Sequence, residues 1–217
     1  AVAPIVITKH SVQNTVNGEK RYRAIRGRRT FFFPQISGYA VSAYFQAYTN
    51  TYDRLDSLIL KYEEALAYPG VEGLIVGTRP DCMPEGLLDY FAGAFPAKFV
   101  MIEMDWKDVD KTLVRINRGH THEESESAIR RTAAKGIYTG AHLILGLPGE
   151  SRDEILHHAD VLSRLPITTL KLHQLQLIKN TRMAKEFKED PSDFHLYTAD
   201  EYIELVIDFI ERLNPLS

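Results

Sequence analysis

Apolar residues recur with two different spacings along this chain, and segments with one spacing alternate with segments with the other. Short segments in which every second residue is apolar are typical of β-strands, and longer segments with apolar residues three or four positions apart are typical of helices. This pattern predicts strands over residues 3–8, 43–48, 73–77, 98–103, 137–147 and 168–175. It predicts helices over residues 54–68, 84–91, 108–116, 121–135, 151–165 and 199–213.

The clearest junction between the two periods is residues 140–150, which read Gly-Ala-His-Leu-Ile-Leu-Gly-Leu-Pro-Gly-Glu. The alternation stops at the Leu-Pro-Gly turn, and acidic residues then fill the first helical turn, where the helix dipole favours them. A strand, a tight turn and a helix in this order form half of a βαβ unit, which places ligands at the carboxyl end of its strand. Gly146 and Gly149 fit a close approach of the backbone to a ligand, and they fit an ordinary tight turn equally well.

Strand and helix alternate at a spacing of roughly 30 residues, with no repeat of fixed sequence. This alternation predicts an α/β fold with a parallel sheet and right-handed crossovers. Polar side chains recur at or near the strand ends with one parity, so in a barrel they would converge inside its upper mouth. These residues are Gln46, Arg79, Glu103, His142, Lys171 and His173. We therefore expect a partial (β/α) barrel of parallel strands rather than an open, doubly wound sheet.

Composition divides the chain into three parts. Residues 1–41 form an irregular basic segment, since residues 1–40 hold seven Lys or Arg (positions 9, 20, 21, 23, 26, 28 and 29) against one acid, Glu19. A nucleic-acid-binding arm and a solvated segment both explain this charge. Residues 42–190 are expected to form the part-barrel core. Residues 191–217 are expected to supply an amphipathic helix that packs on the barrel.

Overall charge and cysteine content limit the binding partners and the cellular compartment that we expect for this protein. The formal net charge of −3 gives the whole protein no general attraction to nucleic acid. The single cysteine, Cys82, excludes an internal disulfide framework and fits a reducing compartment. No apolar run approaches the ~20 residues that span a bilayer. We expect a cytoplasmic protein without a membrane partner.

The polar residues near the strand ends allow several chemistries. Lys171 and His173 share one strand face, and a desolvated Lys171 could act as a Schiff-base nucleophile, or it could pair with a carboxylate such as Glu103. His142 and His173 could be metal ligands or hydrogen-bonded core histidines. Arg79 could bind an anionic group, or it could close a structural turn with Asp81.

Five motifs together resemble the YhcC-type radical S-adenosylmethionine proteins over about residues 42–215. They are Ala43-Tyr-Phe-Gln-Ala-Tyr-Thr-Asn50, Val76-Gly-Thr-Arg-Pro-Asp-Cys82, Arg115-Ile-Asn-Arg-Gly-His120, His142-Leu-Ile-Leu-Gly-Leu-Pro-Gly-Glu150 and Leu170-Lys-Leu-His173. The resemblance implies a partial (β/α)6 barrel and a [4Fe-4S] cluster that cleaves S-adenosylmethionine reductively to a 5′-deoxyadenosyl radical. It implies that Gln46, Thr78, Arg79, Glu103, His142 and Gly146 bind the cofactor, and that Lys171 and His173 are the catalytic candidates.

The chain departs from this family where the cluster would bind. Three cysteine thiolates must hold the cluster, and the family places them in the loop after its first strand. Residues 26–33 overlap the segment where the family has Gly-Arg-Gly-Gly-Cys-Thr-Phe-Cys. In the register that pairs Thr30 with the family's threonine, Arg29 and Phe32 replace two ligands, and Cys82 follows the wrong strand. We therefore expect no metal ligands and no cluster in this chain as written, and a barrel that is incomplete at both ends.

A second departure is Glu103-Met-Asp-Trp-Lys107, where the family reads Glu-Tyr-Gly-(Ile/Leu)-Glu. Loss of one base explains it, because TAT GGA TTG GAA read from its second base gives Met-Asp-Trp-Lys. The unusual N-terminal segment could likewise be a frame error or joined fragments. Resequencing of the gene and the intact mass test this hypothesis.

Three functional hypotheses follow from the sequence. The first is a radical S-adenosylmethionine protein acting on an unknown small-molecule or RNA substrate, without its cluster in this chain. The second is a non-catalytic module that binds S-adenosylmethionine or a nucleotide, and the third is an aldolase-like barrel that uses Lys171. A homodimer is a further expectation, because an incomplete barrel leaves sheet edges that need covering.

Overall fold

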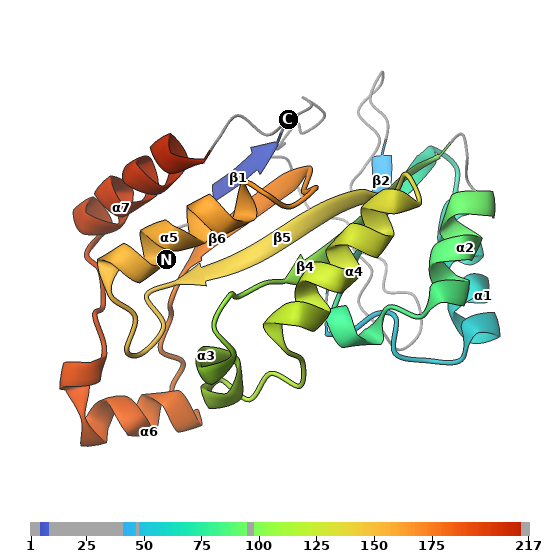
Figure 1. Cartoon of the computed structure of the whole chain (residues 1–217). Coiled ribbons are helices and arrows are strands. Elements are labelled where there is room, and N and C mark those ends of the chain that lie inside the picture. Colours follow the sequence, from blue (N-terminus) through green and yellow to red (C-terminus); the bar gives the residue numbers. More distant parts are fainter. Residues whose placement is uncertain (1–4, 9–40, 47, 95–97, 214–217) are drawn as a thin grey trace.

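A computed structural model describes residues 5–8, 41–46, 48–94 and 98–213 (Figure 1). The described strands are β1 (Ile5–Thr8), β2 (Val41–Phe45), β3 (Val71–Thr78), β4 (Phe99–Asp105), β5 (Tyr138–Leu145) and β6 (Thr169–Gln174). The helices are α1 (Leu55–Leu66), α2 (Glu85–Ala94), α3 (Asp110–Arg115), α4 (His122–Ala134), α5 (Arg152–Leu162), α6 (Arg182–Glu189) and α7 (Ala199–Arg212). Two short 3₁₀ turns, Pro80–Cys82 and Pro191–Asp193, complete the set.

The strands form one sheet in the order β1-β6-β5-β4-β3-β2. Strands β2 to β6 are parallel to their neighbours, whereas β1 pairs antiparallel with β6. The five parallel strands form a half-barrel, which confirms the predicted α/β part-barrel. The basic run 20–29 lies outside the described residues, so its two interpretations stay open.

Alternation along the strands separates an apolar face from a polar one. Leu74 and Val76 on β3, Ile102 on β4 and Leu143 on β5 belong to the core, together with buried residues of α1, α2, α4, α5 and α7. Figure 1 shows these helices along the sheet, with α7 next to α5. Because side chains alternate between the faces, residues one position away, such as Glu103, point to the face opposite this core.

The sequence-encoded helix starts are present in the structure. Thr121, the first residue of the helix predicted over 121–135, forms a capping box with Glu124 at the start of α4. Ser151 does the same with Glu154 at α5, directly after the Leu-Pro-Gly turn. The pattern did not predict α6, whose eight residues include no fully buried side chain.

No helix in the described part of the chain is both long and apolar enough to cross a bilayer.

The two faces of α7 give a stability prediction. Leu205 is completely buried, whereas Ile207 is 49% exposed. We expect Leu205→Ala to lower the free energy of unfolding by about 2–5 kcal/mol, because it removes buried methyl groups and leaves a cavity. The matched variant Ile207→Ala should cost less than about 1 kcal/mol. Urea unfolding of both variants measures this, and equal losses would contradict the placement of α7.

Candidate functional site

The carboxylate of Glu103 on β4 is the centre of the candidate site. Its side chain is only 2% exposed. The Tyr44 hydroxyl on β2 donates to Glu103 Oε2 at 2.6 Å, and His142 Nε2 on β5 lies 3.1 Å from the same oxygen. The Lys171 ammonium on β6 lies 2.8 Å from Oε2 and 2.6 Å from Oε1. One carboxylate therefore joins side chains from four of the five parallel strands.

This contact set requires the sheet to curve. Strands β2 and β6 are four strand spacings apart in the sheet order, which is about 19 Å in a flat sheet. Nevertheless Lys171 Nζ donates to the Tyr44 hydroxyl at 2.9 Å and lies 4.7 Å from the centre of the Tyr44 ring. The half-barrel thus brings together its first and last parallel strands on its inner face.

The electrostatics keep Glu103 ionised. Burial by itself would raise the pKa of Glu103, but the hydrogen bond from His142 and the charge of Lys171 outweigh it and lower this pKa to about 2. Burial, together with the Glu103 charge, raises the pKa of Tyr44 well above its usual range. The phenol therefore stays protonated and donates to a carboxylate at any ordinary pH.

His173 lies beside this group on β6. The ring centres of His142 and His173 are 5.3 Å apart. Burial, and then the neighbouring His142 and Lys171, lower the pKa of His173, so its imidazole is neutral at pH 7. Its Nε2 is buried and has no hydrogen-bond partner among the described residues. His173 thus offers an unused ring nitrogen at the inner face.

A small hollow opens at the carboxyl ends of β4 and β5. It measures about 20 Å³, and it is lined by Asp105, Trp106, Lys107, Leu113, Ile116, Arg118, His142, Ile144 and Leu147. Arg118 Nη1 pairs with Asp105 Oδ2 at 2.8 Å, and both side chains are about one-third exposed. The Trp106 side chain is buried, and its indole N–H has no partner in the described part of the chain. Sequence reasoning missed Trp106 and the Asp105–Arg118 pair, although Arg118 lies within a quoted motif.

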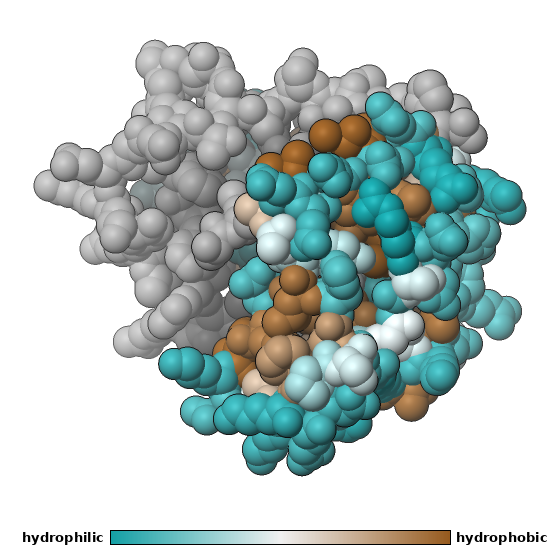
Figure 2. Space-filling model, turned by 90° about the vertical axis from the view of Figure 1, so that its left-hand side faces the viewer, coloured by the Kyte–Doolittle hydropathy of each residue, from teal (hydrophilic) through white to brown (hydrophobic). Residues whose placement is uncertain are grey.

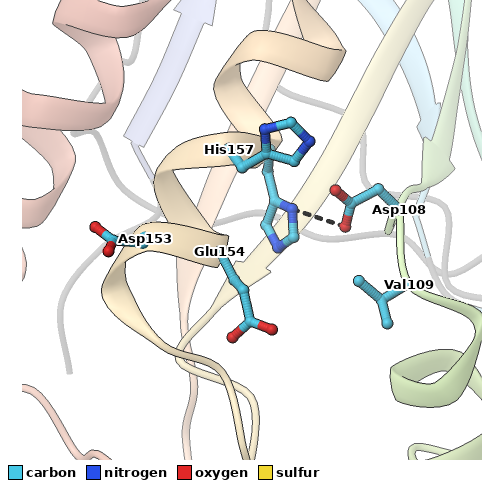
Figure 3. A pocket seen from close by; sticks show the side chains of 6 residues that line it. Asp108, Val109, Asp153, Glu154 and His157 are labelled. Atoms are coloured by element: carbon cyan, nitrogen blue, oxygen red, sulfur yellow. Dashed lines mark ion pairs between the residues drawn. The ribbon is translucent and has the colours of Figure 1, made fainter.

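A larger hollow of about 280 Å³ lies between the segment after β4 and α5 (Figure 3). Its lining is Asp108, Val109, Asp153, Glu154, His157 and His158. None of the residues predicted from the sequence lines it. We therefore place the candidate site at the smaller hollow, next to Glu103 and His142.

The structure separates the remaining predicted residues from the Glu103 group. Gln46 is exposed just beyond β2. Thr78 is buried at the end of β3, where its hydroxyl bonds that of Thr51. Arg79 Nε and Nη2 donate to the two Asp81 oxygens at 2.9 and 2.5 Å, which is the structural turn that the sequence allowed.

Lys171 and Gly146 also take defined structural roles. Lys171 is paired with Glu103, the arrangement that the sequence left open beside the Schiff-base nucleophile. The Schiff-base role of Lys171 stays a prediction. Gly146 has a φ of +82°, and a Cβ there would lie 2.9 Å from the Tyr197 ring. Glycine is therefore required at this turn, whether or not a ligand binds.

The residues present do not fit a [4Fe-4S] cluster. The whole sequence contains one cysteine, and three thiolates are needed. Cys82 lies in the 3₁₀ turn after β3. Within the described ranges, no group of three or more His, Cys, Asp or Glu side chains could hold a metal ion.

The segment that departs from the family pattern packs well as written. Met104 and Trp106 are buried in the hydrophobic core. Lys107 is also buried, and it forms an ion pair with Glu150. The fold thus accommodates these residues, and the hypothesis of a lost base stays a prediction for resequencing.

The low pKa of Glu103 predicts a specific acid sensitivity. Between about pH 4.5 and 2 the unfolded chain binds a proton at this residue and the folded chain does not, so stability falls as pH falls through this window. We expect Glu103→Gln to flatten the pH dependence of unfolding there and to cost about 3 kcal/mol at pH 7. Urea unfolding between pH 2.5 and 7 measures both effects.

The matched control removes an exposed carboxyl, Glu72 on β3. Glu72→Gln should leave both the slope and the stability near those of the unaltered protein. An equal response of the two variants would show that the Glu103 ion pairs do not contribute as the geometry indicates.

Sequence comparisons place these features in a known family. The family model described as the radical SAM superfamily matches residues 20–162, about two thirds of the chain, and the radical SAM C-terminal domain matches residues 167–216. Uncharacterized protein YtqA of Bacillus subtilis is 34% identical over 174 residues, covering 80% of this chain and 53% of that protein. Protein YhcC of Escherichia coli is 36% identical over 148 residues, covering 67% and 48% respectively. The chain thus spans about half the length of the curated relatives it matches.

Solved structures support the same fold. Coproporphyrinogen III oxidase (HemN) from Escherichia coli, described as a radical SAM enzyme, matches with a TM-score of 0.58 and 16% identity over 75% of this chain and 37% of its own. Elp3 from the archaeon Methanocaldococcus infernus matches with a TM-score of 0.55 and 22% identity over 64% of this chain and 32% of its own. At these identities the likeness concerns the fold alone.

The family models, the relatives of about 35% identity and the half-barrel of five parallel strands agree. This chain belongs to the radical S-adenosylmethionine superfamily.

Proposed function

We propose that this chain is an S-adenosylmethionine-binding half-barrel that, as written, does not build the iron–sulfur cluster of its superfamily. The observation that carries the proposal is the Asp105–Arg118 pair beside His142 at the carboxyl ends of β4 and β5. Ligands of such folds bind at this edge of the sheet. The hollow also lies next to Glu103 and His142, the residues to which the family resemblance gives a cofactor role.

The charges of the hollow match one end of S-adenosylmethionine. The amino-acid end of this molecule carries an ammonium and a carboxylate. Asp105 and Arg118 are partners of opposite charge, each about one-third exposed, so each could exchange the other for the complementary group of the ligand. The unpartnered indole N–H belongs to Trp106, a residue that also lines this hollow. Buried donors without partners are rare in folded proteins, which supports a polar ligand here.

The proposed activity of this chain is limited to binding S-adenosylmethionine and includes no cleavage of it. In the superfamily, the cluster supplies the electron that cleaves the sulfonium. With one cysteine in 217 residues this chain cannot supply the three thiolates, so we assign it no cleavage step. Glu103, Tyr44 and Lys171 would shape and hold the floor of the site.

Binding is tested by calorimetry with S-adenosylmethionine. We expect measurable heat for the unaltered protein, and affinity at least tenfold weaker for Arg118→Met, because a charge-assisted hydrogen bond is lost. Arg130→Met is the matched control, since Arg130 lies on α4 and contacts Glu126. No heat at millimolar ligand, or equal affinity of the Arg118 and Arg130 variants, would contradict the proposal.

Absence of the cluster is tested by anaerobic reconstitution with iron and sulfide. We expect far less than four irons per chain, no brown colour, and no 5′-deoxyadenosine after addition of dithionite and S-adenosylmethionine. Near-stoichiometric iron and sulfide with a brown chromophore would show that other residues supply the ligands.

A further inference from the structure

Lys107 is a charged residue in an unusual position. It follows β4 by two residues, and its side chain is only 2% exposed. Its ammonium pairs with Glu150 Oε1 and lies 3.4 Å from the backbone oxygen of Ile144 on β5. Lysines are almost never buried to this extent unless a partner compensates the charge.

Glu150 connects Lys107 to the turn after β5. Its Oε2 accepts the backbone N–H of Leu147 at 2.9 Å, while Oε1 faces Lys107. The Gly149 N–H donates in turn to the backbone oxygen of Asp193 at 2.8 Å. Burial alone would raise the pKa of Glu150, but His158 and Lys107 lower it, so the side chain stays a carboxylate.

A second buried contact supports the pair from α5. His158 Nε2 lies 3.5 Å from Glu150 Oε1, and His158 Nδ1 lies 2.7 Å from Asp108 Oδ1, the ion pair drawn in Figure 3. The edge of Trp106 packs on His158, with ring centres 5.8 Å apart. The chain therefore closes a loop of contacts from the end of β4 to the turn after β5 and back through α5.

This loop borders the proposed ligand site. Lys107 and Leu147 line the same hollow as Asp105, Arg118 and His142. The backbone N–H of Trp106, as distinct from its indole N–H, donates to the backbone oxygen of His142 at 3.0 Å, which extends the pairing of β4 with β5. The Lys107–Glu150 ion pair thus links the turn to a residue that lines this hollow.

We propose that Lys107 is a positioning residue for the S-adenosylmethionine site: through Glu150 it holds the 146–150 turn closed against the end of β4. This inference rests on the proposed function for its ligand, but its structural part can be tested without ligand. Without the ammonium, the buried Glu150 carboxylate has lost its compensating charge and turns toward solvent. The Leu147 N–H then loses its acceptor.

Hydrogen exchange of the ligand-free protein tests the structural part. In Lys107→Met we expect the amides of residues 144–151 to exchange roughly tenfold faster, with the rest of the sheet unchanged. The double variant K107M/E150Q should restore protection, because a neutral glutamine can stay buried and still accept from Leu147. Leu205→Ala on α7 is the control for general destabilisation, and its turn should remain protected. Unchanged exchange of residues 144–151 in Lys107→Met overturns the proposal.

S-adenosylmethionine titrations of the same four proteins test the positioning role. The affinity should follow protection of the turn rather than global stability: on the order of tenfold weaker in Lys107→Met, restored in K107M/E150Q and unchanged in Leu205→Ala. An opened turn with unchanged affinity overturns the positioning role. If the unaltered protein binds no S-adenosylmethionine, the proposed function fails, and exchange alone decides whether Lys107 holds the turn. Lys107→Gln replaces Lys107→Met, with the same expectations, should the latter not fold.

Discussion

The buried carboxylate of Glu103 is the constraint on which the inner face of this half-barrel depends. Tyr44, His142 and Lys171 converge on it from three other strands, and the contact between Tyr44 and Lys171 exists only because the sheet curves. A buried charge is costly unless it is paired and hydrogen-bonded, and here every partner comes from a different strand. The curvature of the sheet therefore brings these polar side chains together, and their contacts in turn stabilise the curved sheet.

A second ionic pair, Lys107 with Glu150, lies at the rim of the half-barrel, just beyond the carboxyl ends of β4 and β5. Glu103 and His142 lie on β4 and β5, and Lys107 and Glu150 follow these strands. Ionic contacts and the apolar packing of Ile102 and Leu143 therefore both hold this part of the sheet. The turn between β5 and α5 has a second contact, since Gly149 also bonds the segment before α7. Such a rim presents a preorganised edge to a ligand, which lowers the entropic cost of binding.

The chain combines the architecture of a radical S-adenosylmethionine protein with a sequence that cannot ligate the cluster. The family models cover most of it, yet its one cysteine lies after β3. Fold and chemistry are separable in this way because the barrel is held by strand pairing and core packing, whereas cluster chemistry depends on a few side chains. What the described residues retain is a polar floor, a charged rim and an unpartnered indole N–H.

The sequence by itself determined the strands, most helices, the capping box at Thr121, and the shared face of Glu103, His142 and Lys171, because periodicity and capping are local properties. The cysteine count alone excluded the cluster ligands. Only the tertiary structure decided the partners: Lys171 binds Tyr44 across 127 positions of sequence, Lys107 pairs with Glu150, and Arg79 pairs with Asp81. Alternation states which face a side chain occupies, but strand curvature and the packing of the connecting turns decide which charges on that face come within reach of each other.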